Sequence, residues 1–253
     1  MVTAIIGGSG LSKFSGMEIH REHAVATPFG ETSAPIQEGR VDGCDGVLFL
    51  HRHGGRGRPI PPHLVNYRAN IWALRELGAT RIIAANAVGA INAQLRPGRL
   101  VIPDQLIDYT WGREHTFDDG SSGSIMHIDF TYPFDENLRR ELLAAALYTA
   151  VPCDDGGVLA VVQGPRLETA AEITHVARDG CDIIGMTSMP EASLAREAGI
   201  AYAAVAMIVN AAAGLEDQPI SFDRIREVLH RETELFAALV AGFLAHQGDA
   251  SPS

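Results

Sequence analysis

The chain has few cysteines and no long apolar segment. Its three cysteines, Cys44, Cys153 and Cys181, are odd in number and lack metal-ligand spacing, which argues against a disulfide framework or a zinc site and favours a reducing cytoplasm. No apolar run reaches the roughly 18 residues that a membrane-spanning helix requires. The first apolar residues are not preceded by a basic segment, so no secretory signal is expected.

Positive charge is also scarce. The chain has 20 Lys and Arg residues against 31 Asp and Glu residues, a formal net charge of −11. This balance argues against nucleic acid or an anionic membrane as a partner, whereas a small anion needs only a local basic pocket. In contrast, apolar residues make up 46% of the 253 residues, enough for one large domain with a full core.

Short apolar segments alternate with amphipathic ones, which is typical of the α/β class. Strands are predicted at 4–6, 46–50, 81–85, 100–103, 157–163, 182–186 and 202–209. Helices are predicted near 63–77, 136–148, 170–177 and 191–197. A last helix carries its apolar residues on one face: Phe222, Ile225, Leu229, Phe236, Leu239, Val240 and Phe243. We expect a single domain over residues 1–247, a disordered tail over 248–253 and a surface loop from Thr110 to Ser124.

Two capping boxes mark helix starts. Thr169 to Glu172 and Ser188 to Glu191 both have the spacing of a hydroxyl residue followed by a glutamate three positions later. We therefore assign Glu172 and Glu191 to helix caps and not to chemistry. Glu168 and Thr187 precede these boxes and are expected where a strand passes into a helix.

Asn210 ends the most apolar segment of the chain, which reads as a buried central strand. Ligands of open α/β sheets sit at the carboxyl ends of such strands. A primary amide there can accept one hydrogen bond and donate another, the pattern required by N7–H and O6 of a 6-oxopurine. The small residues Ala211 and Ala212 are assigned to the same site. The alternative is an asparagine that caps a turn.

Three other segments follow predicted strands. The first, Gly7-Gly8-Ser9-Gly10, is a glycine turn that fails the spacing of the known nucleotide loops and suits a phosphate oxygen, or is a plain tight turn. The second, from His51 to Arg58, is a local basic cluster in which a turn after His53 could let Arg52 and His53 converge. A His-x-His metal pair and a solvated loop are its alternatives. The third, Asn86 to Gly89, is small enough for a ligand to approach the backbone, or is simply a turn.

The ends of these strands offer phosphate donors, a carboxylate, a hydroxyl and an amide. Neither a nucleophile–base pair nor a metal cage is apparent, so no metal and no cofactor is predicted. This combination favours a reaction in which phosphate itself is the nucleophile.

The chain resembles the trimeric purine nucleoside phosphorylases, and is most similar to their methylthionucleoside branch. The resemblance rests on motifs that occur in order over nearly the whole chain: Gly7 to Leu11, Thr27 to Gly30, Arg52 to Gly54, Val65 to Asn70, Gly164 to Arg166 and Met186 to Glu191. It implies a single-domain α/β fold with a twisted central mixed sheet flanked by helices. It also implies a homotrimer, or a dimer of such trimers, with inorganic phosphate as co-substrate.

The resemblance also implies roles for individual residues. The phosphate ligands would be Ser9, Arg52, His53, the Asn86-Ala87 backbone and Thr187. Met186 would pack under the ribose, and His127 would reach into the site of a neighbouring subunit. Ser9 stands where the methylthioadenosine members usually have threonine, which keeps the hydroxyl.

The residues at the base position favour a 6-oxopurine. Adenosine-type members of the branch have two aspartates where this chain has Asn210 and Ala212. Asn210 can donate to O6 and accept the proton that N7 gains. The carboxylate of Glu168 accepts N1–H of a 6-oxopurine but would repel the N1 lone pair of adenine. Hypoxanthine and guanine are not separated by this argument.

Phe222 and Ile225 are predicted to form an apolar wall suited to a 5′-methylthio group, where ordinary nucleoside phosphorylases of this fold have a histidine. The alternative is that both belong to the core face of the last helix. The expected reaction is phosphorolysis of S-methyl-5′-thioinosine. The rivals are phosphorolysis of inosine and guanosine, phosphorolysis of methylthioadenosine, and nucleoside binding without turnover.

Overall fold

The computed structural model describes residues 1–8, 10–11, 14–55, 59–121, 123, 125–218 and 220–249, with side chains described as far as His246. Ser9 of the glycine turn, Arg56 and Arg58 of the basic cluster, and residues 250–253 of the predicted tail lie outside these ranges. Among the described helices, none has both the length and the apolar character needed to cross a membrane.

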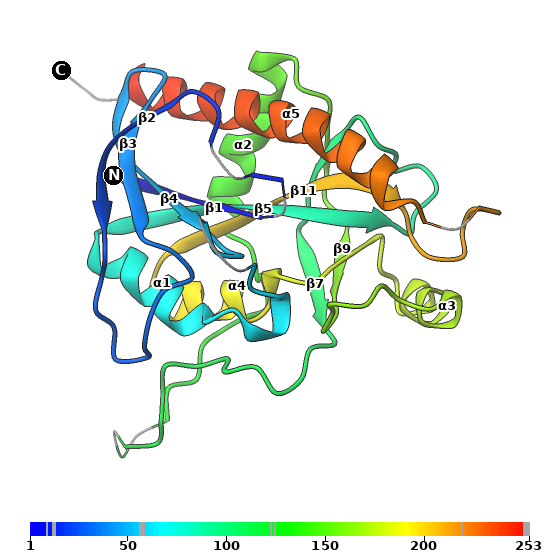
Figure 1. Ribbon diagram of the computed structural model, residues 1–253, viewed down its shortest axis with the longest axis horizontal. Coiled ribbons are helices and arrows are strands. Elements are labelled where there is room, and N and C mark those ends of the chain that lie inside the picture. Colours follow the sequence, from blue (N-terminus) through cyan, green and yellow to red (C-terminus); the bar gives the residue numbers. More distant parts are fainter. Residues whose placement is uncertain are drawn as a thin grey trace.

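Within the described residues, eleven strands form one mixed sheet (Figure 1). They are β1 (Val2–Gly7), β2 (Met17–His23), β3 (Ile36–Val41), β4 (Cys44–His51), β5 (Ala79–Ala90), β6 (Leu100–Ile102), β7 (Gln105–Asp108), β8 (Cys153–Asp155), β9 (Val158–Val161), β10 (Ile183–Gly185) and β11 (Ala201–Ala211). The main path runs β2-β3-β4-β1-β5-β10-β9-β7, and β11 pairs with β5 and β6.

The long strand β5 organises this sheet. It pairs in parallel with β1 and β11, whereas its last residues, Gly89 and Ala90, pair antiparallel with β10. The parallel strands β4, β1, β5 and β11 therefore present their carboxyl ends at one edge. At that edge β10 pairs with the last residues of β5, and β9 pairs with β10, so the segments that follow β9 and β10 lie beside the site described below.

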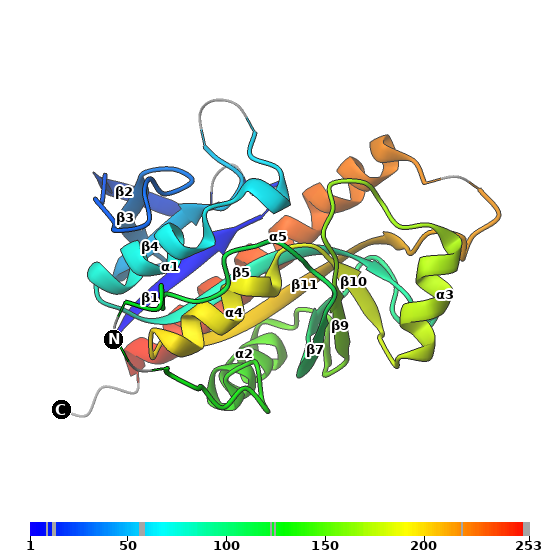
Figure 2. The same cartoon turned by 90° about the horizontal axis from the view of Figure 1, so that it is seen from below.

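Helices cover both faces of the sheet (Figure 2). One face carries η1 (Pro62–Leu64), α1 (Tyr67–Glu76) and α4 (Ser188–Glu197), the other carries α2 (Glu136–Thr149) and α5 (Phe222–Asp249), and α3 (Ala170–Arg178) packs beside β9 and β10. Successive strand residues point to opposite faces. Ala4 and Ile6 accordingly join the core under α1 and α4, and Ile5 joins the core under α2 and α5. The α/β class and the mixed sheet are thus confirmed.

Both central strands are longer than their apolar segments predict. The segment Asn86 to Gly89 lies inside β5, not in a turn after it, and Asn210 lies inside β11. The two strands continue because they pair with each other as far as Ala90 and Ala211, with a register shift between Ile208 and Asn210. Backbone pairing, and not side-chain hydrophobicity, sets where these strands end.

Helix starts match the prediction in one case and not in others. Thr169 and Glu172 form the predicted capping box of α3. The box at Ser188 is wrong, because Thr187 precedes the helix without a side-chain cap and Met189 and Pro190 have non-helical dihedrals.

Two further boundaries differ from the prediction. Helix α1 begins at Tyr67 and not at His63, since the Asn66 side chain accepts a hydrogen bond from the Ala69 N–H at 3.1 Å and caps the helix there. Helix α5 continues through Gly248 and Asp249, both predicted to lie in the tail.

Candidate active site

A pocket of about 300 Å³ lies at the edge where β4, β5 and β11 end, next to the segments that follow β9 and β10. It brings together most of the predicted site residues: Arg52, His53, Ala87, Glu168, Met186, Thr187, Asn210, Ala212 and Phe222. These residues come from positions spread over the whole chain, so the fold, and not any one motif, assembles the site.

Arg52 is the buried cation of this pocket. Strand β4 ends at His51, and Arg52 and His53 turn toward the pocket, as the glycines after them suggested. The Arg52 side chain is fully buried. Its Nη1 donates to the Ala85 carbonyl at 2.8 Å. Gly8 lies against it, since a Cβ at Gly8 would meet the Ala85 oxygen at 2.7 Å and Nη1 at 3.0 Å.

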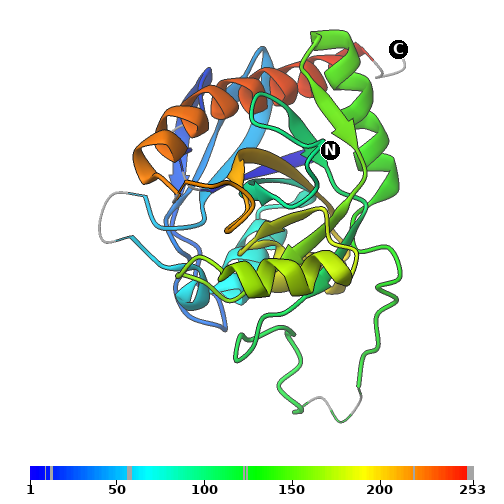
Figure 3. The ribbon, with the colours of Figure 1, turned by 90° about the vertical axis from the view of Figure 1, so that its right-hand side faces the viewer.

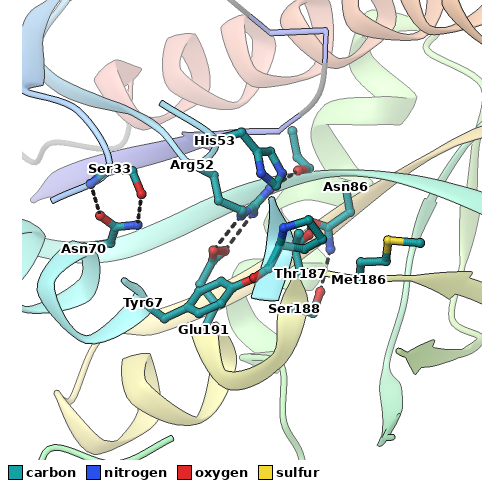
Figure 4. Close-up of polar contacts among 12 residues, drawn as sticks. Ser33, Arg52, His53, Tyr67, Asn70, Asn86, Met186, Thr187, Ser188 and Glu191 are labelled. Atoms are coloured by element: carbon teal, nitrogen blue, oxygen red, sulfur yellow. Dashed lines mark hydrogen bonds and ion pairs between the residues drawn. The ribbon is translucent and has the colours of Figure 1, made fainter. Parts of the chain in front are cut away.

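Glu191 is the partner of Arg52, which corrects its assignment to a helix cap. Nε and Nη2 of Arg52 donate to the two carboxylate oxygens of Glu191, each at 2.7 Å (Figure 4). The Tyr202 hydroxyl donates to the same carboxylate at 3.0 Å. Burial lowers the pKa of Arg52, but the charge and hydrogen bonds of Glu191 outweigh burial, so the pKa lies above its ordinary value and Arg52 stays a cation.

His53 is held by its backbone surroundings. Its Nδ1 lies 2.9 Å from the Ile60 carbonyl oxygen. Burial and the charge of Arg52 both lower the pKa of His53, so the ring is neutral at pH 7. A proton on Nδ1 then donates to Ile60, and Nε2 is left as an acceptor.

His51 does not join His53. Its ring packs edge-on against Phe49 with centroids 4.7 Å apart. Across the part of the chain that the structure describes, no group of three His, Cys, Asp or Glu side chains could hold a metal ion. The His51 and His53 rings thus have different partners, Phe49 and the Ile60 carbonyl.

Thr187 lines the same pocket as Arg52 and His53. Its hydroxyl donates to Asn86 Oδ1 at 3.2 Å, and the Asn86 amide donates in turn to the Ser188 hydroxyl. Asn86 itself is only 3% exposed. The pocket wall at this point is made by its neighbours Ala87, Val88 and Gly89. The Asn86 side chain thus orients Thr187 from behind.

Asn210 and Glu168 also line the pocket. One N–H of the Asn210 amide donates to the Ala211 carbonyl at 2.6 Å, which leaves the second N–H and Oδ1 unused by that bond. Ala212 lines the pocket beside Asn210, but Ala211 is not among the described lining residues, because alternate residues of a strand face opposite sides. Burial raises the pKa of Glu168, and Glu172 raises it further.

An apolar wall completes the pocket. Ile220, Phe222, Ile225 and Leu229 line it at the start of α5. Figure 3 shows this helix start, in orange, and α3, in yellow-green, on opposite sides of the strand ends. Phe222 is 61% exposed, so it is not part of the core to which the helical periodicity assigned it. Ile225 packs partly against that core.

Besides Asn86 and Ala211, two other predicted residues are not among the described residues that line this pocket. Ser9 lies outside the described residues. His127 is exposed on the segment that joins β7 to α2 and is not among the described residues that line the pocket.

Arg113, on the same segment, was missed. Its side chain is 8% exposed although it falls in the predicted surface loop. Its guanidinium donates to the backbone carbonyls of Met186 and Gln163. The polar sequence around Arg113 carries no signal for this burial.

Comparisons with known proteins show the family to which the chain belongs. Residues 2–245 match the model of the phosphorylase superfamily. The chain is 49% identical over 228 residues to a probable S-methyl-5′-thioinosine phosphorylase of Pseudomonas syringae, covering 90% of this chain and 92% of that protein. It is 43% identical over 242 residues to the 6-oxopurine nucleoside phosphorylase of Pyrococcus furiosus, covering 94% and 89%.

A solved structure also matches this chain over nearly its whole length. Methylthioadenosine phosphorylase from Schistosoma mansoni in complex with adenine superposes with a TM-score of 0.92 at 34% identity, covering 98% of this chain and 92% of that one. The predicted nucleoside phosphorylase resemblance, and with it a pentosyltransferase type of enzyme, is confirmed. The chain belongs to the phosphorylase superfamily.

Proposed function

We propose that the protein catalyses the reversible phosphorolysis of S-methyl-5′-thioinosine, which yields hypoxanthine and 5-(methylthio)ribose 1-phosphate. The observation that carries this proposal is one pocket whose lining combines three chemically distinct sets of residues. We assign the buried cation and the hydroxyl to one end, the amide and the carboxylate to a second, and the apolar wall to a third. Relatives named for this activity, at 49% and 50% identity, support it.

The first end would bind phosphate. A guanidinium carries five N–H donors, and Arg52 uses three of them on Glu191 and Ala85. The remaining two can bind phosphate oxygens, for which the guanidinium geometry is well matched. His53 would accept a hydrogen bond from a phosphate O–H through Nε2, and Thr187 would turn its hydroxyl from Asn86 to the anion. Ser9 and the Asn86-Ala87 backbone remain predicted ligands. Phosphate is a co-substrate, and we propose no cofactor.

The second end would read the base. The free N–H of the Asn210 amide would donate to O6 of hypoxanthine, and Oδ1 would accept the proton on N7. The Glu168 carboxylate would accept N1–H. Adenine offers neither an oxygen at position 6 nor a proton on N1, so it would leave these groups unpaired. A mismatch of buried polar groups can reduce kcat/KM by about 10⁴-fold.

The third end would hold the 5′ substituent. Phe222, Ile225 and Leu229 offer only hydrocarbon to a ligand, which suits a methylthio group better than a hydroxyl. Apolar pockets discriminate by about 10- to 200-fold, so inosine is expected to react more slowly and not to be excluded. Met186 would lie under the ribose between the phosphate and base ends.

The reaction would proceed by displacement at C1′. A phosphate oxygen forms a bond to C1′ while the C1′–N9 bond breaks, and the electron pair of that bond passes to the purine. The purine takes up a proton from water at N7, and the new phosphate monoester releases its O–H proton to water. Positive charge develops on the ribose next to the phosphate dianion, so orientation and charge would supply much of the rate. Asn210 and Glu168 would stabilise the departing base.

We also propose that the enzyme is a homotrimer, or a dimer of trimers, and that it acts in the cytoplasm. The segment between β7 and α2 exposes His127 together with the apolar side chains of Trp111, Ile125 and Met126, exposed by 72%, 78% and 65%. Apolar exposure of this kind is typical of a subunit contact. In a trimer it would let His127 complete the site of a neighbour.

Phosphate-dependent release of base from S-methyl-5′-thioinosine, inosine and 5′-methylthioadenosine, measured side by side, tests this function. We expect the largest kcat/KM with methylthioinosine and little release without phosphate. A larger value with inosine would overturn the role of the apolar wall, and a larger value with methylthioadenosine would overturn the base assignment. Calorimetric binding without product would show a nucleoside-binding module instead.

A further inference from the structure

Arg113 is a buried arginine whose surroundings are backbone carbonyls. It lies on the segment between β7 and α2, which extends from the body of the molecule in Figures 1 and 3, yet its side chain is only 8% exposed. Its guanidinium carbon lies 5.5 Å from the centre of the Tyr67 ring. Burial lowers the pKa of Arg113, so the cation depends on well-placed acceptors.

The guanidinium binds backbone carbonyls of two separate segments, and Nη1 also donates to the Tyr67 hydroxyl at 3.3 Å. Nη2 donates to the carbonyl oxygens of Gln163 at 2.9 Å and Val162 at 3.3 Å. Nη1 donates to the carbonyl oxygens of Met186, at 2.9 Å, and Met189. One pair of carbonyls directly follows β9 and the other follows β10.

These contacts lie where the sheet stops holding the two segments together. The ladder between β9 and β10 ends at Val161 and Gly185, and one more bond joins the Val162 N–H to the Gly185 oxygen at 2.9 Å. Beyond that bond the chains separate toward Glu168 on one side and Thr187 on the other, and both residues line the pocket. Arg113 therefore bridges the strands at the point where they separate to form the site.

The chain between these contacts is tightly packed. Gly164 has a φ of +58°, and a Cβ there would overlap the Met186 sulfur. A small change in the separation of the two segments would therefore alter the contact between Gly164 and Met186. A planar guanidinium with its donors in a fixed fork sets such a separation better than a flexible ammonium group.

We propose that Arg113 is a positioning residue, whose guanidinium fixes the spacing between the Glu168 segment and the Met186–Thr187 segment. It acts through backbone carbonyls without touching the substrate. The inference rests on the proposed function, because it assigns Glu168 to the base and Thr187 to phosphate. It also ties the segment that carries His127 to the pocket of its own subunit.

The test compares Arg113→Ala and Arg113→Lys with Glu114→Ala, a matched change at the next residue, whose side chain is 73% exposed and pairs with Arg68 at the surface. We expect Arg113→Ala to lower kcat/KM for methylthioinosine by about 10²-fold, since misplaced reacting groups cost this much. Added guanidinium chloride at millimolar concentration should restore part of the loss, and equal sodium chloride should not. Arg113→Lys should be intermediate, and Glu114→Ala should match wild type.

Hydrogen–deuterium exchange in the absence of substrate separates this inference from the proposed function. In Arg113→Ala, peptides that cover 162–169 and 185–190 should exchange faster than in wild type, and guanidinium should slow them again. If Arg113→Ala does not fold, the same two measurements are made on Arg113→Lys. Wild-type exchange and kcat/KM within twofold of wild type in the folded variant would overturn the inference, as would a loss that guanidinium does not restore. Inactive wild-type enzyme with the expected exchange would instead refute the proposed function alone.

Discussion

Two carboxylates near the pocket, one buried and one half-buried, have opposite roles. Glu191 is 1% exposed and fully engaged by Arg52 and Tyr202, so its charge is balanced and serves to orient the cation. Glu168 lies at the pocket surface, and the nearby Arg166 is itself held by Glu172 at 2.7 and 2.8 Å. Glu168 is therefore the carboxylate that is open to a ligand, and burial raises its pKa.

The decrease of kcat/KM at acid pH should follow the protonation of Glu168. Burial raises its pKa above the ordinary 4.5, and only the ionised form accepts N1–H of the base. We expect kcat/KM for methylthioinosine to fall as the pH is lowered through this raised pKa. The fall should disappear in Glu168→Gln, whose plateau value is lower. An unchanged acid limb in Glu168→Gln would assign the titration to another group, such as His53.

A second variant checks the sign of this shift. Glu172→Gln removes a negative charge and frees Arg166, and both changes lower the pKa of Glu168, so the acid limb should move to lower pH.

The raised pKa of Glu168 also affects the stability of the fold, with the opposite dependence on pH. A carboxyl whose pKa is raised by folding stabilises the folded state at low pH, and this contribution is lost as the pH rises through the raised pKa. In Glu168→Gln, this part of the decrease in the free energy of unfolding with rising pH should be absent.

At the residue scale, the sequence predicted the pocket residues that lie near strand ends. It did not predict the residues, Glu191 and Arg113, whose hydrogen bonds keep these pocket segments in place. Arg52, His53, Thr187 and Asn210 each lie beside an apolar segment, so their convergence follows from the α/β pattern. Glu191 and Arg113 could not be found in this way. Their partners lie 139 and 73 residues away in the chain, and nothing in the local spacing records such a contact.

At the scale of elements, α5 serves the core and the pocket with a single apolar face. Phe236, Leu239, Val240 and Phe243 are buried beneath it, whereas Phe222, Ile225 and Leu229 line the pocket at its start. Sequence periodicity predicts this face correctly but cannot say where the sheet beneath it ends. The packing of α5 on the sheet determines which residues of this face belong to the core and which line the pocket.

Phe222→His should change selectivity at the 5′ position without loss of stability. An imidazole can hydrogen-bond a 5′-hydroxyl and packs less well on a methylthio group, so the ratio of kcat/KM for methylthioinosine to that for inosine should fall by about 10-fold or more. The melting temperature should not change, because Phe222 is 61% exposed. Leu147→His, at a residue that is 85% exposed on α2, is the matched control. An unchanged ratio would show that Phe222 does not contact the substrate.

Among the described strands, the sequence missed β2, β3, β7 and β8, and β2, β7 and β8 share a physical cause. Most residues of β2 are exposed, and β7 and β8 are only four and three residues long. A short or solvated strand has no apolar alternation to detect. In contrast, the buried strands β1, β4, β5 and β11 were all predicted, and these four position the pocket.

At the scale of the whole molecule, the prediction is an assembly in which subunits complete one another. The native mass should be three times the chain mass of 27.1 kDa, or six times for a dimer of trimers. In Asn210→Ala, each pocket lacks the amide that would contact the base. In His127→Ala, each pocket lacks the histidine that a neighbouring subunit would supply. Each variant alone should therefore be weakly active. Co-expressed, the two should regain activity, because mixed trimers contain pockets with Asn210 and a neighbour's His127 intact. A monomeric mass, or no regain in mixed assemblies, would contradict the role of His127.

The central claim is that Asn210 and Glu168 select a 6-oxopurine. The most direct measurement is the ratio of kcat/KM for methylthioinosine to that for methylthioadenosine, in wild type and in the variant that combines Asn210→Asp, Ala212→Asp and Glu168→Ser. The wild-type ratio should be well above one, and the combined variant should shift it toward adenine by several orders of magnitude, up to about 10⁴-fold. The same ratio in both proteins would contradict the claim.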